Sequence, residues 1–250
     1  MLDSIMAFIA VGFAAQMVDG ALGMAYGVLA TSILLAQGLT PAVASASVHA
    51  AETFTTAASG ASHWRLGNVD KKLLWRLAGP GVIGGVLGAV VLTSFPGDKI
   101  RPFVALYLLF AGVIVLVRGL NGSHHAQMLG SHALMACGFV AGFLDAAGGG
   151  GWGLLVTSSL MWGGLAPRVA IGTACLAEFF VTTAVTATFL GTIGTGPWPV
   201  VLGLIIGGVI AAPIAAYAAR HVPERPMMIG VGALVMALSL REIYKAGWIL

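Results

Sequence analysis

Residues 144–153 read LDAAGGGGWG, and residues 18–27, which lie 126 positions earlier, read VDGALGMAYG. At this offset the match extends over the 40 positions from Asp19 to Ala58, of which 18 are identical without a gap. Shared apolar composition alone does not align an Asp, a Glu, a Pro and a Thr-Ser pair together. The chain is therefore predicted to be a duplication, with a first repeat at residues 1–120 and a second repeat at residues 127–246.

The composition around these stretches is that of a membrane protein. Of the 250 residues, 58% are hydrophobic and only 8% are charged, and the mean hydropathy is +0.97. A soluble domain carries about 25% charged residues, because water must solvate its surface. A helix needs about 20 apolar residues to cross a bilayer core of about 30 Å, so this length allows about eight to ten segments. We expect one membrane domain that contains both repeats.

Apolar runs separated by charged residues, proline or glycine give the expected segments. None of them alternates with the period of two that a barrel strand needs, whereas a helix satisfies its own backbone hydrogen bonds in lipid. The predicted fold class is therefore an all-α polytopic membrane protein. The runs are 5–18, 24–37, 41–63, 73–95, 102–118, 130–144, 150–163, 167–190, 198–219 and 226–243.

Basic residues in the loops indicate how the repeats are oriented, because cytoplasmic loops carry an excess of Lys and Arg. The loop at 64–76 has four basic residues, whereas its counterpart near 191–197 has no charge. Such unlike loops favour inverted-topology repeats over parallel ones, which would split the basic residues seven to five. The inverted arrangement places Arg65, Lys71, Lys72, Arg76, Arg118, Arg168, Arg220 and Arg225 inside, and Lys99, Arg101, Arg241 and Lys245 outside.

The first apolar element of each repeat is interrupted. Runs 5–18 and 24–37 have about 14 residues each, which is about 21 Å of helix and too short to cross comfortably. Short, glycine-interrupted segments at matching places in two halves indicate the central site of a transporter. We expect a broken or re-entrant first helix in each repeat, with its tip near the midplane. The glycines could instead serve close helix packing.

Four carboxylates lie within apolar runs, where a charge is costly and suggests function. Asp19 and Asp145 lie at the breaks, where a role in capping the next helix competes with a role in binding. Glu52 and Glu178 each lie eleven residues after the proline that opens their run, so capping does not explain them.

Polar residues around Glu52 follow one face of the predicted helix, because their spacings are 4, 3, 4, 3 and 4. They are Ser45, His49, Glu52, Thr56, Ser59 and His63. Such a stripe in a membrane helix faces a wet cavity or a polar partner. The second repeat keeps only Cys175, Glu178 and Thr182 of it, so we expect the two repeats to differ in function.

No Lys or Arg lies in the middle of any run, so a bound anion would be met by half-helix N-termini and their free N–H groups. Nearby carboxylates would repel an anion unless they were protonated. This predicts proton coupling through Glu52, Glu178 and His49. The predicted substrate-binding residues are Asp19, Gly20, Gly23, Tyr26, Asp145, Gly148, Gly149, Gly150, Gly151, Trp152 and Thr182.

The duplicated Asp-containing, glycine-rich segments are each followed by Leu-x-Pro, at Leu39–Pro41 and Leu165–Pro167, and then by a helix with a central Glu. In this the chain resembles the sulfite exporter TauE/SafE family, also called the 4-toluene sulfonate uptake permease family, over nearly its whole length. The resemblance implies a secondary transporter of small sulfur-containing anions, such as sulfite, sulfonates or thiosulfate, in a prokaryotic cytoplasmic membrane. The first repeat departs from the pattern, because it has only Gly20 and Gly23 where the second has a glycine run.

A cation or metal-ion transporter is the main alternative, because four buried carboxylates without a buried Arg suit a cation. An enzyme is not expected, since the Gly-x-Gly-Asp and Tyr-Asp motifs of intramembrane aspartyl proteases are missing. The two cysteines, Cys137 and Cys175, have no metal-site or disulfide spacing. No cofactor, metal site or nucleic-acid partner is predicted. The exact substrate, the direction of transport, the coupling ion and a homodimeric state stay open.

Overall fold

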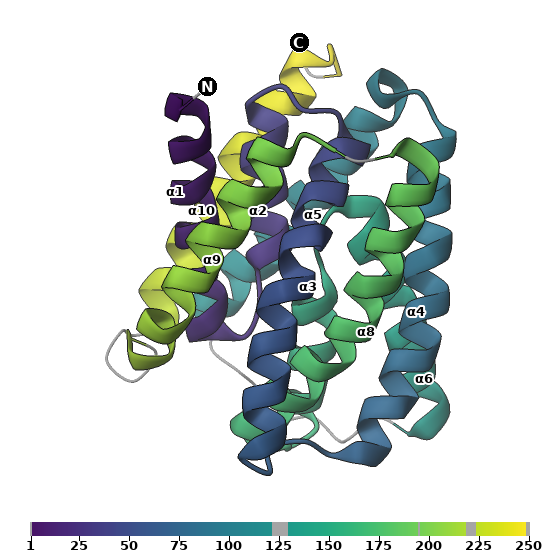
Figure 1. The fold of residues 1–250 in the computed structure, drawn as a ribbon, viewed down its shortest axis with the longest axis vertical. Helices are drawn as coiled ribbons and strands as arrows, with labels where there is room; N and C mark the ends of the chain where they lie inside the picture. The colour runs from purple at the N-terminus through teal and green to yellow at the C-terminus, as the bar shows by residue number, and fades with distance from the viewer. Residues whose placement is uncertain (1, 122–129, 195, 219–223, 249–250) are drawn as a thin grey trace.

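The computed structural model describes residues 2–121, 130–194, 196–218 and 224–248, and within these ranges the chain is all-helical, as predicted (Figure 1). The first five helices are α1 (Leu2–Leu22), α2 (Tyr26–Ala36), α3 (Pro41–Arg65), α4 (Lys71–Ser94) and α5 (Gly97–Asn121). They are followed by α6 (Ser131–Gly148), a π-helical turn η1 (Gly153–Thr157), α7 (Ser158–Trp162), α8 (Pro167–Ile193), α9 (Trp198–Ala218) and α10 (Glu224–Lys245).

Five of the described helices are long and apolar enough to cross a membrane, namely α4, α5, α6, α8 and α10. Helix α3 has 25 residues but is less apolar, because it carries the polar stripe around Glu52. Many large apolar side chains on these helices face outward, among them Ile83, Phe110 and Leu190. Exposed apolar surface of this kind is what lipid contact requires.

Local chemistry sets where several helices begin. Pro41 and Pro167 occupy the first turns of α3 and α8. A backbone N–H in the first turn has no partner within the helix, so the missing N–H of proline costs nothing there. The Asp70 carboxylate accepts hydrogen bonds from Lys72 N at 2.9 Å and Leu73 N at 3.0 Å, which caps α4.

The helices before the two breaks each end four residues later than expected. Helix α1 stays continuous through Asp19 and Gly20 and ends at Leu22, and α6 stays continuous through Asp145 to Gly148. The chain leaves the helix only where the backbone adopts positive φ, at Gly23 (67°) and Gly149 (76°). Glycine adopts such angles without strain, so the glycines and not the aspartates set the breaks.

The helices pack in four main pairs, α1 with α9, α4 with α6, α3 with α8, and α5 with α10. Helices α3 and α8 are antiparallel, because a Cβ on Gly172, near the start of α8, would touch His63 near the end of α3. Farther along, the hydroxyls of Thr53 and Thr186 are 3.3 Å apart. The α3–α8 pair runs through the middle of the molecule (Figure 1).

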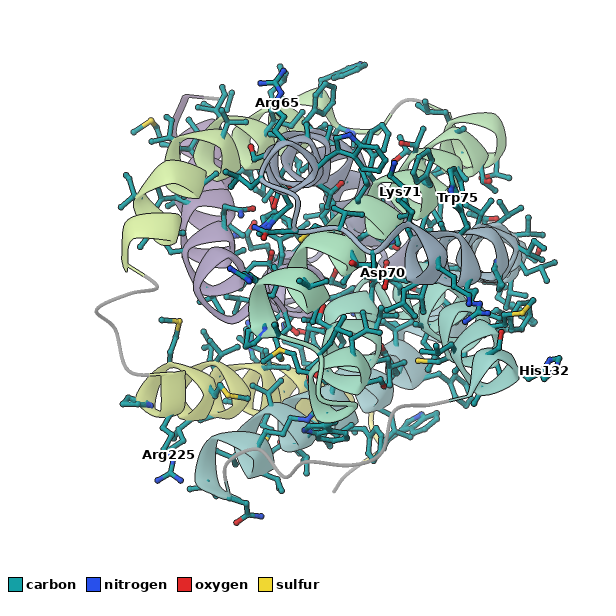
Figure 2. The ribbon with its side chains drawn as sticks, turned by 90° about the horizontal axis from the view of Figure 1, so that it is seen from below. Arg65, Asp70, Lys71, Trp75, His132 and Arg225 are labelled. Atoms are coloured by element: carbon teal, nitrogen blue, oxygen red, sulfur yellow. The ribbon has the colours of Figure 1, made fainter. Side chains whose placement is uncertain are left out.

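The charged loops gather at the ends of the helices. Figure 2 looks onto the end that carries Arg65, Asp70 and Lys71 of the α3–α4 connection, together with His132 and Arg225 at the starts of α6 and α10. Both termini lie near the opposite end (Figure 1). Arg220, expected among the inside residues, lies outside the described residues.

Candidate functional site

The two breaks meet in the centre of the molecule, with backbone packed directly on backbone. A Cβ on Gly27 would lie 2.6 Å from Gly150 Cα, and one on Gly153 would lie 2.8 Å from Met24 Cα. The Thr31 hydroxyl donates to the Gly149 carbonyl across the same contact. Only glycine allows this approach, so both breaks contribute to a single region.

Each aspartate faces the N-terminus of the half-helix that follows its break. Tyr26 N donates to Asp19 Oδ1 at 3.4 Å, and Trp152 N donates to Asp145 Oδ1 at 3.0 Å. These are the hydrogen bonds of the capping role that the sequence left open. They leave Asp145 Oδ2 free for a second partner.

That second partner is His49 of α3, whose side chain is fully buried. Its Nδ1 lies 2.8 Å from the Ser45 carbonyl, which can only accept, so Nδ1 carries a proton. Its Nε2 lies 3.1 Å from Asp145 Oδ2. Two unprotonated acceptors would repel at this distance, so the contact requires a proton on one of them.

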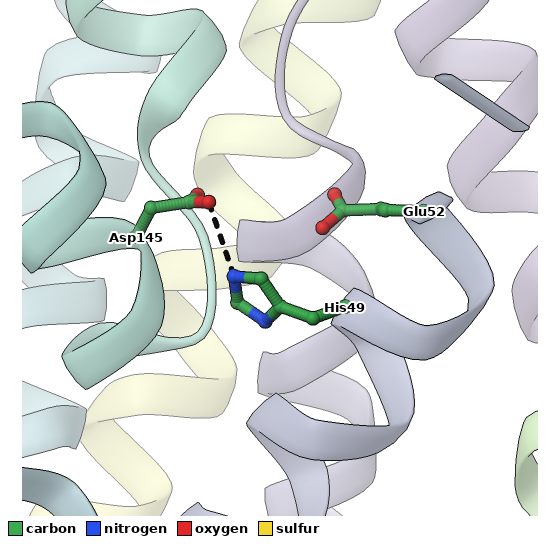
Figure 3. Close-up of side chains that lie close together, drawn as sticks. All are labelled: His49, Glu52 and Asp145. Carbon is green, nitrogen blue, oxygen red and sulfur yellow. Dashed lines mark hydrogen bonds and ion pairs between the residues drawn. The ribbon is translucent and has the colours of Figure 1, made fainter. Parts of the chain in front are cut away.

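Glu52 completes this group from the next turn of α3 (Figure 3). Its side chain is 4% exposed, and its Oε2 has no hydrogen-bond partner among the described residues. The ligand atoms of His49, Glu52 and Asp145 all lie within 4.8 Å of one another. Within the described part of the chain, neither Lys nor Arg pairs with them. The group can hold protons, and its spacing would also admit a small cation.

The second repeat supplies less to this group. Glu178 is half-buried on α8 and stands outside the close set formed by His49, Glu52 and Asp145. Thr182 is buried, and its hydroxyl donates to the Phe179 carbonyl of its own helix at 3.2 Å.

Tyr26 and Trp152 occupy equivalent positions after the two breaks but differ in their partners. Trp152 is fully buried and donates from Nε1 to the Ala174 carbonyl at 3.1 Å. Tyr26 is 3% exposed, and its hydroxyl has no hydrogen-bond partner among the described residues. A buried hydroxyl without a partner is available to a bound solute.

The predicted glycines differ in what their backbones contact. Gly20 lies within α1, where a Cβ would meet Ala215 of α9 at 2.6 Å, so it serves helix packing. Gly23 packs on Ile171. The backbones of Gly149 and Gly150 contact the first half-helix, whereas Gly148 and Gly151 face the Tyr107 side chain.

Three residues outside the predicted set also support the site. Tyr107 of α5 donates from its hydroxyl to the Gly150 carbonyl at 2.5 Å, and Ser45 donates to the Ala146 carbonyl at 2.7 Å. The third is Thr31, described above. Thr31 is part of the repeated Thr-Ser pair, and Tyr107 places a hydroxyl within an apolar run. The sequence could therefore have indicated both residues as candidates for the site.

Arginines also bind each half-helix, and those that bind α2 do so at its far end. Arg101 of α5 donates to the carbonyls of Leu35 (2.5 Å) and Leu39 (3.4 Å), and Arg241 of α10 donates to Ala36 (3.0 Å). The half-helix of the second repeat is bound by Arg118.

Arg118, on α5, donates to the Leu154 carbonyl at 3.0 Å and to the Ser158 hydroxyl. Its guanidinium also lies over the Trp162 ring, 4.5 Å from the centroid. Each half-helix is therefore held by an arginine from the last helix of the other half.

Comparison with known proteins places this arrangement among membrane transporters. The profile of the family described as sulfite exporter TauE/SafE matches residues 8–241. A relative from Bacillus subtilis (strain 168), described as a probable membrane transporter protein, YtnM, is 43% identical over 256 residues, covering 99% of this chain and 85% of the relative. No solved structure matches the chain.

Proposed function

The chain belongs to the sulfite exporter TauE/SafE family of membrane transporters, and from that premise we propose that it moves small sulfur-containing anions across the cytoplasmic membrane. The solutes are of the sulfite, sulfonate or thiosulfate class, and transport is coupled to protons. It proceeds by alternating access around the meeting point of the two breaks. The observation that carries the proposal is the buried contact of two half-helix N-termini beside His49, Glu52 and Asp145.

The helix pairs support two inverted repeats, with boundaries near 1–120 and 127–246. The first helix of each half packs on the fourth helix of the other half, as α1 on α9 and α6 on α4. The third helices pair with each other, and so do the fifth. A two-fold axis produces such reciprocal pairs. Because α3 and α8 are antiparallel, this axis would lie in the membrane plane.

The glycine breaks support an anion site. Half-helix N-termini offer unpaired N–H groups and the positive end of the helix dipole, and glycine lets a solute approach the backbone. Tyr26, the first residue of α2 after the break, adds a buried hydroxyl that lies near Gly208 of α9 and has no described hydrogen-bond partner. Asp19 and Asp145 already face these N-termini, so an anion must share them with two carboxylates.

This crowding of negative charge supports proton coupling. Asp19, Glu52, Asp145 and Glu178 lie in a membrane domain where no described Lys or Arg forms an ion pair with them. A carboxylate that takes up a proton stops repelling an anion. We assign this role to Glu52 and Glu178. His49, which lies on α3 with Glu52, exchanges a proton with Asp145 through its Nε2.

A second candidate function is transport of a cation or metal ion. The close spacing of one imidazole and two carboxylates favours it, because these are ligands of divalent ions. In this case the buried carboxylates would bind the cargo directly.

Accumulation of labelled sulfite in proteoliposomes, with and without an imposed pH gradient, tests the proposal. We expect uptake to depend on the gradient, and Glu52→Gln and Glu178→Gln to slow it at least tenfold and to flatten its pH dependence. Asp98→Asn, at an exposed carboxylate, is the matched control and should behave like the parent protein. Uptake that does not depend on the gradient would refute proton coupling, and unchanged rate and pH dependence in both Gln variants would refute the assignment to Glu52 and Glu178. Accumulation of Mn²⁺ instead of sulfite would favour the second candidate.

A further inference from the structure

A second polar cluster lies away from the central site, at the outer end of α2. Glu242 of α10 is 3% exposed, and its Oε2 accepts from Arg101 Nε at 2.8 Å and Nη2 at 2.6 Å. Arg241 and Lys245 lie 3.8 Å and 3.7 Å from the other oxygen, Oε1. The proposed function uses none of these groups.

The cluster joins three helices at one point. Arg101 lies on α5 and forms an ion pair with Glu242 of α10. It also donates to carbonyls at the end of α2. Arg241 makes a further bond from α10 to α2. Removing the ion pair would weaken the hold of α5 on the end of α2, because Glu242 orients Arg101 while Arg101 binds α2, and would leave the Arg241 bond as the remaining contact of this cluster with α2.

Two buried oxygens in this cluster are left without hydrogen-bond partners among the described residues. Neither Glu242 Oε1 nor the Ser239 hydroxyl has a hydrogen bond among the described residues, although Ser239 is only 2% exposed. Both line a narrow gap between α2, α5 and α10, together with Ser32, and the gap leaves no room for a water molecule. Buried polar atoms without partners are costly, and water entering an opened gap would satisfy them.

We infer that Arg101, Arg241 and Glu242 form the gate on this side of the transporter, seen here closed. The ion pair and the carbonyl contacts hold the end of α2 shut, while the two unpartnered oxygens favour the hydrated, open arrangement. Such opposing terms suit an element that must adopt two states. The inference rests on the proposed transport function, since a gate requires a solute path.

The gap itself provides the probe. Ser239→Cys places a thiol in it, and Cys137→Ser and Cys175→Ser remove the native thiols. The purified protein in detergent is then treated with a bulky hydrophilic maleimide, and labelling is followed as a shift on a gel. In the parent background we expect slow labelling, because position 239 is buried.

Opening the gate should speed this reaction. We expect Arg101→Gln and Glu242→Gln each to raise the labelling rate at least tenfold, and Arg101→Lys to raise it less because the charge is kept. Arg118→Gln is the matched control, because it loosens the half-helix of the other repeat and should leave labelling at 239 unchanged. Thermal unfolding of each variant shows whether it is folded. If Arg101→Gln does not fold, Glu242→Gln still tests the inference.

Equal labelling rates in the parent and in both Gln variants would overturn the inference, and so would an equal rise in Arg118→Gln. This outcome is separate from the proposed function. If labelling stays unchanged while sulfite accumulates, the gate is wrong and the transport proposal stands. If labelling rises but no sulfite is carried, the gate stands as a moving element and the transport proposal fails.

Discussion

The two half-helices that meet at the centre are held in opposite ways. The first, α2, is fixed at its outer end, where Arg101 and Arg241 donate to its last carbonyls and Glu242 fixes Arg101. At its inner end a single bond of 3.4 Å joins Tyr26 N to Asp19, and the Tyr26 hydroxyl has no described partner.

The second half-helix, η1 with α7, shows the reverse pattern. Its inner end is held by Asp145 to Trp152 N at 3.0 Å, by Trp152 Nε1 to the Ala174 carbonyl, and by Tyr107 to the Gly150 carbonyl. Arg118 donates to Leu154 near this inner end and to Ser158 in the middle, and only its contact with the Trp162 ring lies at the outer end. We therefore expect the inner end of α2 to be the part of the site that adapts to a solute, and the glycine loop of the second repeat to be its rigid wall.

The arginines should show the largest difference between the halves. Arg101→Ala leaves Glu242 Oε2 buried without its hydrogen-bond donors, with only Arg241 and Lys245 at 3.8 and 3.7 Å from Oε1, which costs about 3 kcal/mol. Arg118→Ala removes two hydrogen bonds and a contact with Trp162, for about 1–2 kcal/mol. The free energy of unfolding, measured in detergent by titration with SDS, gives both values. Equal losses would mean that the arginines hold the two half-helices alike.

The glycines at the breaks should differ next. In Gly150→Ala the added Cβ would overlap the backbone of Gly27 and Val28, at a cost of about 3 kcal/mol. In Gly23→Ala it would lie 2.9 Å from Ile171 Cγ1, a side-chain atom that can shift, so we expect about 1–2 kcal/mol. The same titration measures both.

Gly164→Ala is the control for backbone strain. Gly164 has φ of +85° and nothing within 4 Å of an added Cβ. The loss of stability in Gly164→Ala therefore reports backbone strain alone. If Gly150→Ala costs no more than this control, the two breaks do not touch.

The capping aspartates give a smaller contrast. Asp145→Ala leaves both Trp152 N and His49 Nε2 without their partner, for about 2–3 kcal/mol. Asp19→Ala removes one long hydrogen bond, for about 1 kcal/mol. Asp145→Asn should recover most of the loss in thermal stability, because its amide can serve both partners. A greater loss for Asp19→Ala than for Asp145→Ala would reverse the assignment of the rigid wall.

The aromatic residues after the breaks give the smallest contrast. Trp152→Phe removes the indole hydrogen bond to the Ala174 carbonyl and should lower stability by about 1 kcal/mol. Tyr26→Phe removes a hydroxyl without a described partner and should change stability by less than about 0.5 kcal/mol, while raising the KM for the solute. If stability fell with Tyr26→Phe and KM did not move, the hydroxyl would have a structural role.

Much of the fold could be predicted because it follows from the apolar pattern. Nine of the ten predicted runs each overlap one described helix, the run at 150–163 covers η1 and α7, and Pro41 and Pro167 open α3 and α8. The position of the breaks could not be predicted as well, because an Asp before a glycine fits both a helix end and a helix interior. The backbone angles at Gly23 and Gly149 decide between them.

The site could be predicted only in part. The 4, 3, 4 spacing placed His49 and Glu52 on one face, and the internal repeat singled out Asp145, but no pattern indicated that His49 bonds to Asp145 from the other half. Tyr107 and Glu242 lie outside the 40 matched positions, so the repeat carried no information about them. Contacts between halves depend on how the helices pack, and a single sequence does not state that packing.

The account depends most on the contact between the breaks, and a cross-link measures it directly. In a background with Cys137→Ser and Cys175→Ser, cysteines replace Met24 and Gly153, whose Cβ positions lie 3.0 Å apart. A disulfide needs about 3.5–4.5 Å between Cβ atoms, which a small relaxation provides. A protease site inserted between residues 122 and 129 separates the halves.

After mild oxidation in membranes and cleavage, we predict that the two halves stay joined on a non-reducing gel and separate when reduced. A protein with cysteines at Met24 and Gly164 serves as the control and should separate in both conditions, because Gly164 has no neighbour within 4 Å of its Cβ position. If the halves of the Met24–Gly153 pair separate without reduction, as in the control, the two breaks do not build one site.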